Sequence, residues 1–324
     1  HFGNFIALLI LAINALFTGL LLLVAYSPYI QPVTHPVQSC FGLTFPIFAL
    51  INGAFLIFWL VIQRYKTALL PLIGFLLCYS QLRTYLPLNF HTANPPEESI
   101  KFLSYNIMGF NGAVKKDGKN PILTYLKESN ADILCLQEYA SAESPRRLTQ
   151  KDIERELKDY PYHRISVVGS GSGYTNKIAC YSKFPILSAR VLNYPSGYNG
   201  SVLYELKLNE DTITLINNHL ESNKLTKADK DIYEDILKAP EKEKVKSGAR
   251  LLVHKLAEAS AIRAPQADTI AREIASSRYP SVIVCGDFND TPISYAHRVI
   301  AQNLDDAFTQ SGRGLGISYN QNKF

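Results

Sequence analysis

The first 96 residues contain only three charged side chains, and this scarcity constrains the fold more than any other feature of the sequence. Arg64, Lys66 and Arg83 are the three, and no Asp or Glu occurs before Glu97. The uncharged run over residues 5–26 is rich in Leu, Ile, Ala and Phe and is long enough to cross a hydrocarbon core of about 30 Å. The sequence therefore predicts a transmembrane helix at 5–26.

Two further apolar runs follow, at 41–62 and 68–88. The run 41–62 contains Pro46 and Gly53, which membrane helices tolerate where neighbouring helices satisfy the freed backbone groups. The run 68–88 contains Arg83, whose charge must reach an interface of the membrane. A secretory signal peptide is the alternative for the first run, although that run is long and no small-residue cleavage site follows it. We predict an all-α, multi-pass membrane region of two to three helices over residues 1–96.

Basic residues in the short loops predict the orientation of these helices, because Lys and Arg accumulate on the cytoplasmic side. The loop over residues 27–40 has no basic residue, whereas the loop over residues 63–67 carries Arg64 and Lys66. With three spans, the chain after residue 88 then lies outside the cytoplasm. We expect an extracytoplasmic location for everything that follows.

A stiff polar stretch over residues 94–98 predicts the boundary of a second domain at 97–324. Removing the three N-terminal charges from the 33 basic residues leaves 30, against 28 acidic ones, so this domain has a net charge of about +2. That balance favours neither nucleic acid nor any other partner, and no protein partner can be inferred. The five cysteines show neither a disulfide pattern nor zinc spacing.

Short β-rich segments alternate with helical ones in this second domain. Helices are predicted at 121–128 and 149–157, and the long charged stretch 221–277 is helix-prone. Alternation of this kind favours an α/β (α+β) fold with covered sheets. The predicted strands are 100–105, 133–137, 178–182, 202–208, 212–217 and 282–285.

Polar residues follow four of these strands, where sheet proteins present catalytic groups. Asn106, Glu138 and His219 each come at or just after the end of a strand, and Asp287 and Asn289 follow Gly286 after the last one. Each has a structural alternative: an Asx turn or helix cap, an exposed Glu, or a core His. Taken together they suit metal-assisted hydrolysis of phosphate esters, because Mg²⁺ needs few carboxylates besides water and substrate oxygens. We expect Mg²⁺, with Mn²⁺ as an alternative.

The order of these motifs resembles the endonuclease/exonuclease/phosphatase superfamily, which includes nucleases similar to exonuclease III and DNase I. The match extends from Ile100 to Phe324. Its motifs, in chain order, are 104–106, 136–138, 176–179 with 182–186, 217–220, Arg263 with Gln266, and 286–289. The resemblance implies a four-layer α/β/β/α sandwich, in which two sheets pack face to face between helices.

The resemblance also implies roles for single residues. Glu138 would be the main metal ligand with Asn106 beside it, Asp287 would orient or deprotonate the attacking water, and Asn289 and His219 would hold the phosphate. The matching residues Asn176, Asn217 and Arg263 are expected to bind substrate. The family's further Asp and its Asp-His pair have no counterpart before Phe324. We therefore expect the C-terminus to be truncated and the chain as given to be inactive or nearly so.

The predicted function is that of a membrane-anchored hydrolase of phosphodiester bonds, acting on nucleic acid or phospholipid. A phospholipid or phosphomonoester phosphatase is the alternative enzyme, because the shared residues act on the phosphate and not on the leaving group. A catalytically dead membrane-tethered binding module is the third hypothesis, although such a protein would be expected to have lost some of these polar residues.

Overall fold

The computed structural model describes residues 2–90, 94–113, 119–144, 146–171, 174–194, 196–226, 228–229 and 242–318. The chain divides into two compact units, each built from segments that are distant in sequence. The first unit comprises residues 1–93, 223–264 and 290–324. The second unit comprises residues 94–222 and 265–289 and contains both sheets. The domain boundaries predicted from the sequence remain a prediction.

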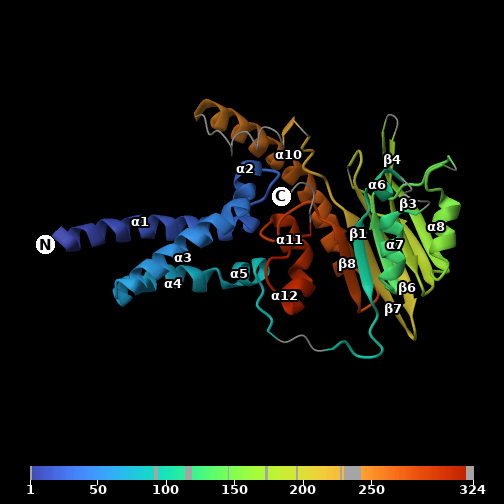
Figure 1. The fold of residues 1–324 in the computed structure, drawn as a ribbon, viewed down its shortest axis with the longest axis horizontal. Coiled ribbons are helices and arrows are strands. Elements are labelled where there is room, and N and C mark those ends of the chain that lie inside the picture. Colours follow the sequence, from blue (N-terminus) through green and yellow to red (C-terminus); the bar gives the residue numbers. More distant parts are fainter. Residues whose placement is uncertain are drawn as a thin grey trace. The chain divides into compact units, whose positions relative to one another are not determined.

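The second unit is built on two four-stranded sheets (Figure 1). The first sheet has the order β1-β2-β4-β3 and the second has the order β5-β6-β7-β8. Within them β1 pairs parallel to β2 and β7 pairs parallel to β8, while the other pairs are antiparallel. The strands are β1 (Phe102–Asn106), β2 (Ile133–Gln137), β3 (Tyr162–Gly171), β4 (Tyr174–Ser182), β5 (Ile186–Val191), β6 (Gly200–Leu208), β7 (Asp211–His219) and β8 (Val282–Asp287).

The two sheets pack face to face around a shared apolar core. Ile133 and Ile178 of the first sheet belong to the same buried cluster as Tyr204 and Leu215 of the second. Strands with buried residues on both faces require a second layer of side chains on the outside. β2 is such a strand, because all five of its residues are buried.

Helices provide the outer layers of this sandwich. α7 (Pro121–Glu128) and α8 (Gln150–Glu156) bury Leu126 and Ile153 in a cluster with Leu134 and Leu136 of β2 (Figure 1). The Asn120 side chain caps α7, and α8 begins with a capping box formed by Thr149 and Asp152. The longest helix in the described part of the chain is α10 (Lys242–Ala275). The predicted α/β class and its two packed sheets are therefore confirmed.

The first unit is mainly helical. α1 (Phe2–Ala25), α3 (Phe45–Val61) and α4 (Tyr65–Leu77) contact one another pairwise and lie side by side (Figure 1). The third predicted span, 68–88, is not one helix, because the chain leaves helical geometry at Cys78 between α4 and α5 (Tyr79–Tyr85). The short helices of this part are η1 (Ser27–Tyr29), α2 (Pro36–Ser39) and η2 (Cys40–Thr44).

A buried polar network links α1 to α3. Thr18 donates to the Asn52 side chain at 2.8 Å, and the Trp59 indole donates to Asn14 at 3.0 Å. The Asn52 amide donates in turn to the carbonyls of Phe17 and Phe48. Polar side chains between apolar helices fix the register of the helices, because any other register leaves these groups without partners.

The segment after Asp290 packs on these N-terminal helices within the first unit. Ile293 joins a buried cluster with Leu21, Phe45 and Cys78, and Arg298 donates to the Pro28 carbonyl at 2.8 Å. Asn89 donates to the carbonyls of Thr309 and Gly312. This segment forms α11 (Tyr295–Ile300), η3 (Ala301–Asn303) and α12 (Ala307–Ser311).

Candidate active site

The predicted catalytic side chains meet where the parallel strands of the two sheets end. In the β1–β2 pair, Asn106 stands opposite Gln137, and in the β7–β8 pair His219 stands opposite Asp287. Both parallel pairs therefore present their carboxyl ends, and the residues that follow, at one edge of the sandwich. Contacts of β8 with both β1 and β2 bring the two edges together.

Asn106 bridges the two carboxylates of the site. Its Nδ2 atom lies 2.9 Å from Oε1 of Glu138 and 2.9 Å from Oδ2 of Asp287. Its Oδ1 atom accepts from the Met108 backbone N–H at 3.1 Å. Because a backbone N–H can only donate, this contact fixes the orientation of the amide. Asn106 therefore donates to both carboxylates in this structure, whereas a role as metal ligand would require its oxygen to face them.

Two residues of the site have a strained backbone. Glu138 has φ +51° and Asn289 has φ +51°, both in the left-handed region that few residues other than glycine adopt. Each such residue costs of order 1–3 kcal/mol and persists only where the surroundings impose it. Here the strain turns the chain sharply at the ends of β2 and β8 and directs both side chains to the edge of the sandwich.

Gly286 permits a close approach of two backbones beside Asp287. Its φ is +136°, and a Cβ placed there would lie 2.1 Å from the carbonyl oxygen of Asn218. Leu220 donates to the Asp287 carbonyl at 2.9 Å, so β7 and β8 stay paired to their last residues. Asn289 donates its backbone N–H to Oδ1 of Asp287 at 3.0 Å and its side-chain amide to the Leu220 carbonyl at 3.0 Å. The loop after β8 is thus fixed on both sides of the carboxylate.

His219 is buried, and its tautomer follows from its neighbours. Asn176 donates to the Tyr198 carbonyl at 2.9 Å, and the same Nδ2 atom lies 3.1 Å from Nδ1 of His219. Because the carbonyl only accepts, Asn176 presents its NH₂ group, and Nδ1 of the neutral imidazole must accept. The proton then resides on Nε2, which lies 3.6 Å from Oε1 of Glu138. The histidine is arranged to donate a hydrogen bond toward the carboxylates.

Burial controls the charge of this histidine. Desolvation lowers the pKa of His219, and the nearby carboxylates Asp287, Glu138 and Glu221 oppose that effect without reversing it. A lowered pKa keeps the imidazole neutral near pH 7. A neutral Nε2–H group therefore faces the site.

Asn217 lies beneath the site and not at its surface. Its side chain is fully buried, accepts from Nε2 of Gln137 at 2.6 Å and donates to the Ala179 carbonyl at 3.4 Å. Gln137 also donates to Ser104 and to the Cys135 carbonyl. These contacts join the two sheets, so Asn217 has no surface available to a substrate here, and we assign it a structural role.

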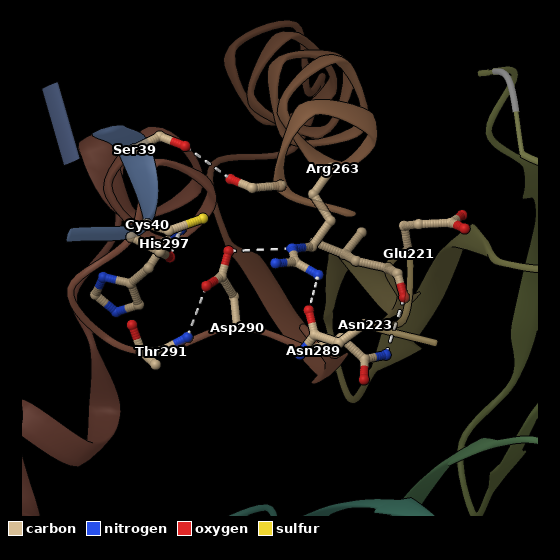
Figure 2. Close-up of polar contacts among 12 residues, drawn as sticks. Ser39, Cys40, Glu221, Asn223, Arg263, Asn289, Asp290, Thr291 and His297 are labelled. Atoms are coloured by element: carbon tan, nitrogen blue, oxygen red, sulfur yellow. Dashed lines mark hydrogen bonds and ion pairs between the residues drawn. The ribbon is translucent and has the colours of Figure 1, made fainter. Parts of the chain in front are cut away.

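Arg263 belongs to the first unit, whereas the residues above belong to the second. Its side chain is buried, with Nε 3.1 Å from Oδ2 of Asp290 and Nη1 2.9 Å from Oδ1 of Asn223 (Figure 2). A buried guanidinium with such partners stabilises its surroundings through charge-assisted hydrogen bonds. Within the second unit the structure thus assembles Asn106, Glu138, Asn176, His219, Asp287 and Asn289, with Asn217 buried beneath them.

Two residues that support the site were not among the predicted functional residues. Gln137 precedes Glu138 and connects the sheets, and Tyr198 orients Asn176 through its carbonyl and packs edge-on against His219. No sequence pattern indicates a backbone carbonyl as a partner. The polar Gln137 within the apolar β2 strand was the available signal, because a buried amide requires hydrogen-bond partners.

Comparison with known families fits this geometry. Residues 103–322 match the endonuclease/exonuclease/phosphatase family. The chain belongs to this family. Residues 7–85 match a separate domain of unknown function (DUF8431). No curated protein matches the chain.

Solved structures similar to this endonuclease/exonuclease/phosphatase family member are distant in sequence. Beta toxin 275-280 from Staphylococcus aureus is 17% identical over 64% of this chain and 73% of its own, with a TM-score of 0.41. The endonuclease/exonuclease/phosphatase from Beutenbergia cavernae is 13% identical over 63% of this chain and 52% of its own, with a TM-score of 0.41. D. rerio TDP2 in complex with a single-strand DNA product is 15% identical over 62% of this chain and 64% of its own, with a TM-score of 0.37.

Enzymes of the endonuclease/exonuclease/phosphatase family are hydrolases of phosphate esters that use divalent metal ions, and the donors of this site fit a hard cation. One oxygen each of Glu138 and Asp287 lies 2.9 Å from the same nitrogen, so both oxygens border one small space. In the described part of the chain no cluster of three or more His, Cys, Asp or Glu residues could hold a metal. Mg²⁺ needs only one or two carboxylates besides water and substrate oxygens, whereas zinc requires a fuller set of protein ligands.

Proposed function

We propose that this chain is a membrane-anchored, Mg²⁺-dependent phosphodiesterase whose reaction takes place at Glu138, Asp287 and His219. The observation that carries the proposal is the bridge from the Asn106 amide to both carboxylates, at 2.9 Å each. Two carboxylates held so close repel each other, and a donor or cation between them offsets that repulsion. The charge and spacing of the pair support a cation site in which Asn106 orients the ligands.

The roles of the side chains follow from their hydrogen bonds. Glu138 would hold the metal, and Asp287 would accept a proton from the attacking water, with its oxygens oriented by the donors Asn289 N–H and Asn106 Nδ2. His219 donates from Nε2 to a phosphoryl oxygen as charge develops there, and Asn289 holds the phosphate from the loop after β8. When bound, Mg²⁺ neutralises phosphoryl charge. Asn176 acts through His219 by setting its tautomer.

The membrane anchor is supported by the N-terminal helices. Two described segments, Phe5–Ala25 and Pro36–Val61, are long and apolar enough to cross a membrane, and only 17% of the most apolar stretch of each is buried. A core helix of a water-soluble domain would be mostly buried. The side chains of Leu8, Leu50 and Val61 are 64%, 76% and 73% exposed. Exposing these apolar side chains costs free energy in water but none in lipid. An extracytoplasmic catalytic domain remains our proposal for the orientation.

A substrate panel tests the proposal and identifies the substrate class. The intact protein in detergent, with any natural residues beyond Phe324, is incubated with plasmid DNA, a phosphodiester phospholipid, bis-p-nitrophenyl phosphate or the monoester p-nitrophenyl phosphate, each with Mg²⁺ and with chelator. We expect chelator-sensitive cleavage of the simple diester and of one natural class. Release of phosphate from monoesters alone would support a phosphatase instead. No hydrolysis of any substrate would support the binding-module hypothesis.

A further inference from the structure

The N-terminal half of α10 carries a basic face that the proposed reaction does not use. Lys246, Arg250 and His254 are spaced four residues apart, so they align on one side of the helix, and all three are exposed. None of them forms an ion pair with another described residue. They line an open hollow of about 480 Å³ together with Ser247 and Leu251.

Exposed apolar side chains adjoin these basic residues. Leu251 is 41% exposed and Val253 is 40% exposed, whereas Gly248 on the opposite side of the helix is buried, as is Ala257 one turn beyond Val253. A helix that combines basic and apolar groups on its free side fits the interface of a bilayer, where both kinds of group find partners. A nucleic acid backbone would use the basic residues but would leave the apolar ones in water.

Within the first unit, α10 contacts the N-terminal region near the start of the candidate span Pro36–Val61. The Ser260 hydroxyl lies 3.2 Å from the hydroxyl of Ser39, and both side chains are buried (Figure 2 shows Ser39). Ser39 lies near the start of the apolar segment Pro36–Val61. At 1.5 Å per helical residue, His254 lies about 9 Å and Lys246 about 21 Å along the helix from Ser260. The basic face therefore begins close to where that span would enter the bilayer.

We infer that this face, formed by Lys246, Arg250, Leu251, Val253 and His254, binds the anionic headgroups of the membrane in which the chain is anchored. The inference rests on the membrane anchor of the proposed function and goes beyond it by assigning a lipid-binding surface. Opposite charge attracts the helix to acidic lipids, and Leu251 and Val253 enter the headgroup region. The face thereby gives the protein a preference for membranes rich in acidic lipids.

Tryptophan reporters in the intact protein test this surface. Leu251→Trp is reconstituted into vesicles of brominated phosphatidylcholine with or without phosphatidylglycerol, and its emission is compared with that of the parent, whose one tryptophan is Trp59. We expect at least twofold stronger quenching of the added tryptophan when the anionic lipid is present. The expected difference disappears when Lys246, Arg250 and His254 are all changed to Gln. Tyr162→Trp, at an exposed position of β3, is the control that anionic lipid leaves unchanged.

A second reporter separates failure of this inference from failure of the membrane anchor. Leu50→Trp, at a 76% exposed position of α3, should be quenched by brominated lipid of either charge. Quenching at position 50 with equal signals from position 251 in both lipids would overturn the inference and leave the anchor standing. No quenching at position 50 would overturn both. A response of position 251 to an added oligonucleotide but not to phosphatidylglycerol would identify the face as a nucleic-acid site and also overturn the inference.

Discussion

At the residue scale, the hydrogen bond between Asn176 and His219 decides which imidazole nitrogen carries the proton. Changing Asn176→Asp places an acceptor 3.1 Å from Nδ1, so the proton moves to Nδ1 and Nε2 can no longer donate. We expect kcat to fall about 10²-fold, the loss typical of one donor to a developing oxyanion, with a small change in KM. Imidazole ¹⁵N shifts report the tautomer directly. Thr175→Ala, an exposed neighbour on β4, is the control; an unchanged tautomer in Asn176→Asp would refute this account of His219.

Both the pairing of β7 with β8 and the position of Asp287 depend on the absence of a Cβ atom at Gly286. A Cβ there would meet the Asn218 carbonyl at 2.1 Å, and the φ of +136° is unfavourable for any side chain. Gly286→Ala should therefore destabilise the protein by about 1–3 kcal/mol, the usual range for overpacking, and lower the melting temperature. Gly197→Ala, where a Cβ meets nothing within 4 Å, should have a small effect. Equal melting temperatures for the two variants would contradict the close approach.

Asp306 should make the stability of the protein depend on pH. Its hydrogen bond with His297, at 2.9 Å, together with the N–H groups of α12, lowers its pKa to about 2. Since the pKa in the unfolded chain is about 3.9, the contribution of Asp306 is complete above that value and is lost as the pH falls through 2. Asp306→Asn should lower the melting temperature at pH 7, and the difference from wild type should shrink toward pH 2. Asp305→Asn serves as the neighbouring control; a difference that does not vary with pH would exclude this effect.

At the element scale, the polar contacts between α1 and α3 should determine how these helices associate. Asn52→Leu removes the acceptor of Thr18 and two donors to backbone carbonyls without leaving a large cavity. We expect a loss of about 0.6–2 kcal/mol, the range measured for interhelical hydrogen bonds in membranes. Unfolding in mixed detergent micelles measures it. Leu50→Ala, on the exposed side of α3, should cost less, and the reverse order would argue against the network.

The strands show which elements the sequence could predict. β2 was predicted to the residue, because its apolar residues are buried on both faces and form a continuous run. The strands β3 and β5 were not predicted, and both are at the edge of a sheet. Five of the six residues of β5 are exposed, so its sequence carries no alternation of apolar and polar residues. The edge strands β1 and β8 could be predicted from their apolar runs, whereas β5 forms through a pairing with β6 that its local pattern does not reveal.

The same limit applies to the site. Asp287, Glu138 and His219 could be predicted because polar residues at the ends of apolar strands are conspicuous, and the parallel pairing brings them together. The burial of Asn217 could not be predicted, because it depends on Gln137 reaching across from the other sheet. The amide orientation of Asn106 depends on the Met108 backbone, which no spacing reveals.

At the scale of the whole molecule, the first compact unit combines segments that are distant in sequence. The first unit contains the N-terminal helices and also residues 223–264 and 290–324, most of which lie within the family match. Ile293 is buried with Leu21 and Phe45 in the core of that unit. Removing the N-terminal helices would therefore expose apolar surface of the remaining chain, and activity is best measured on the intact protein.

The most direct test of the central claim is the Mg²⁺ dependence of bis-p-nitrophenyl phosphate hydrolysis by the intact protein, with any natural residues beyond Phe324, and by three variants. Glu138→Gln and Asp287→Asn each remove one carboxylate of the pair, and Glu128→Gln, exposed at the end of α7, is the matched control. We predict that chelator abolishes hydrolysis, that both site variants lose about 10²–10⁴-fold in kcat, and that the control retains wild-type activity. Hydrolysis that persists in chelator, or in Glu138→Gln at the wild-type rate, would contradict the assignment of this site.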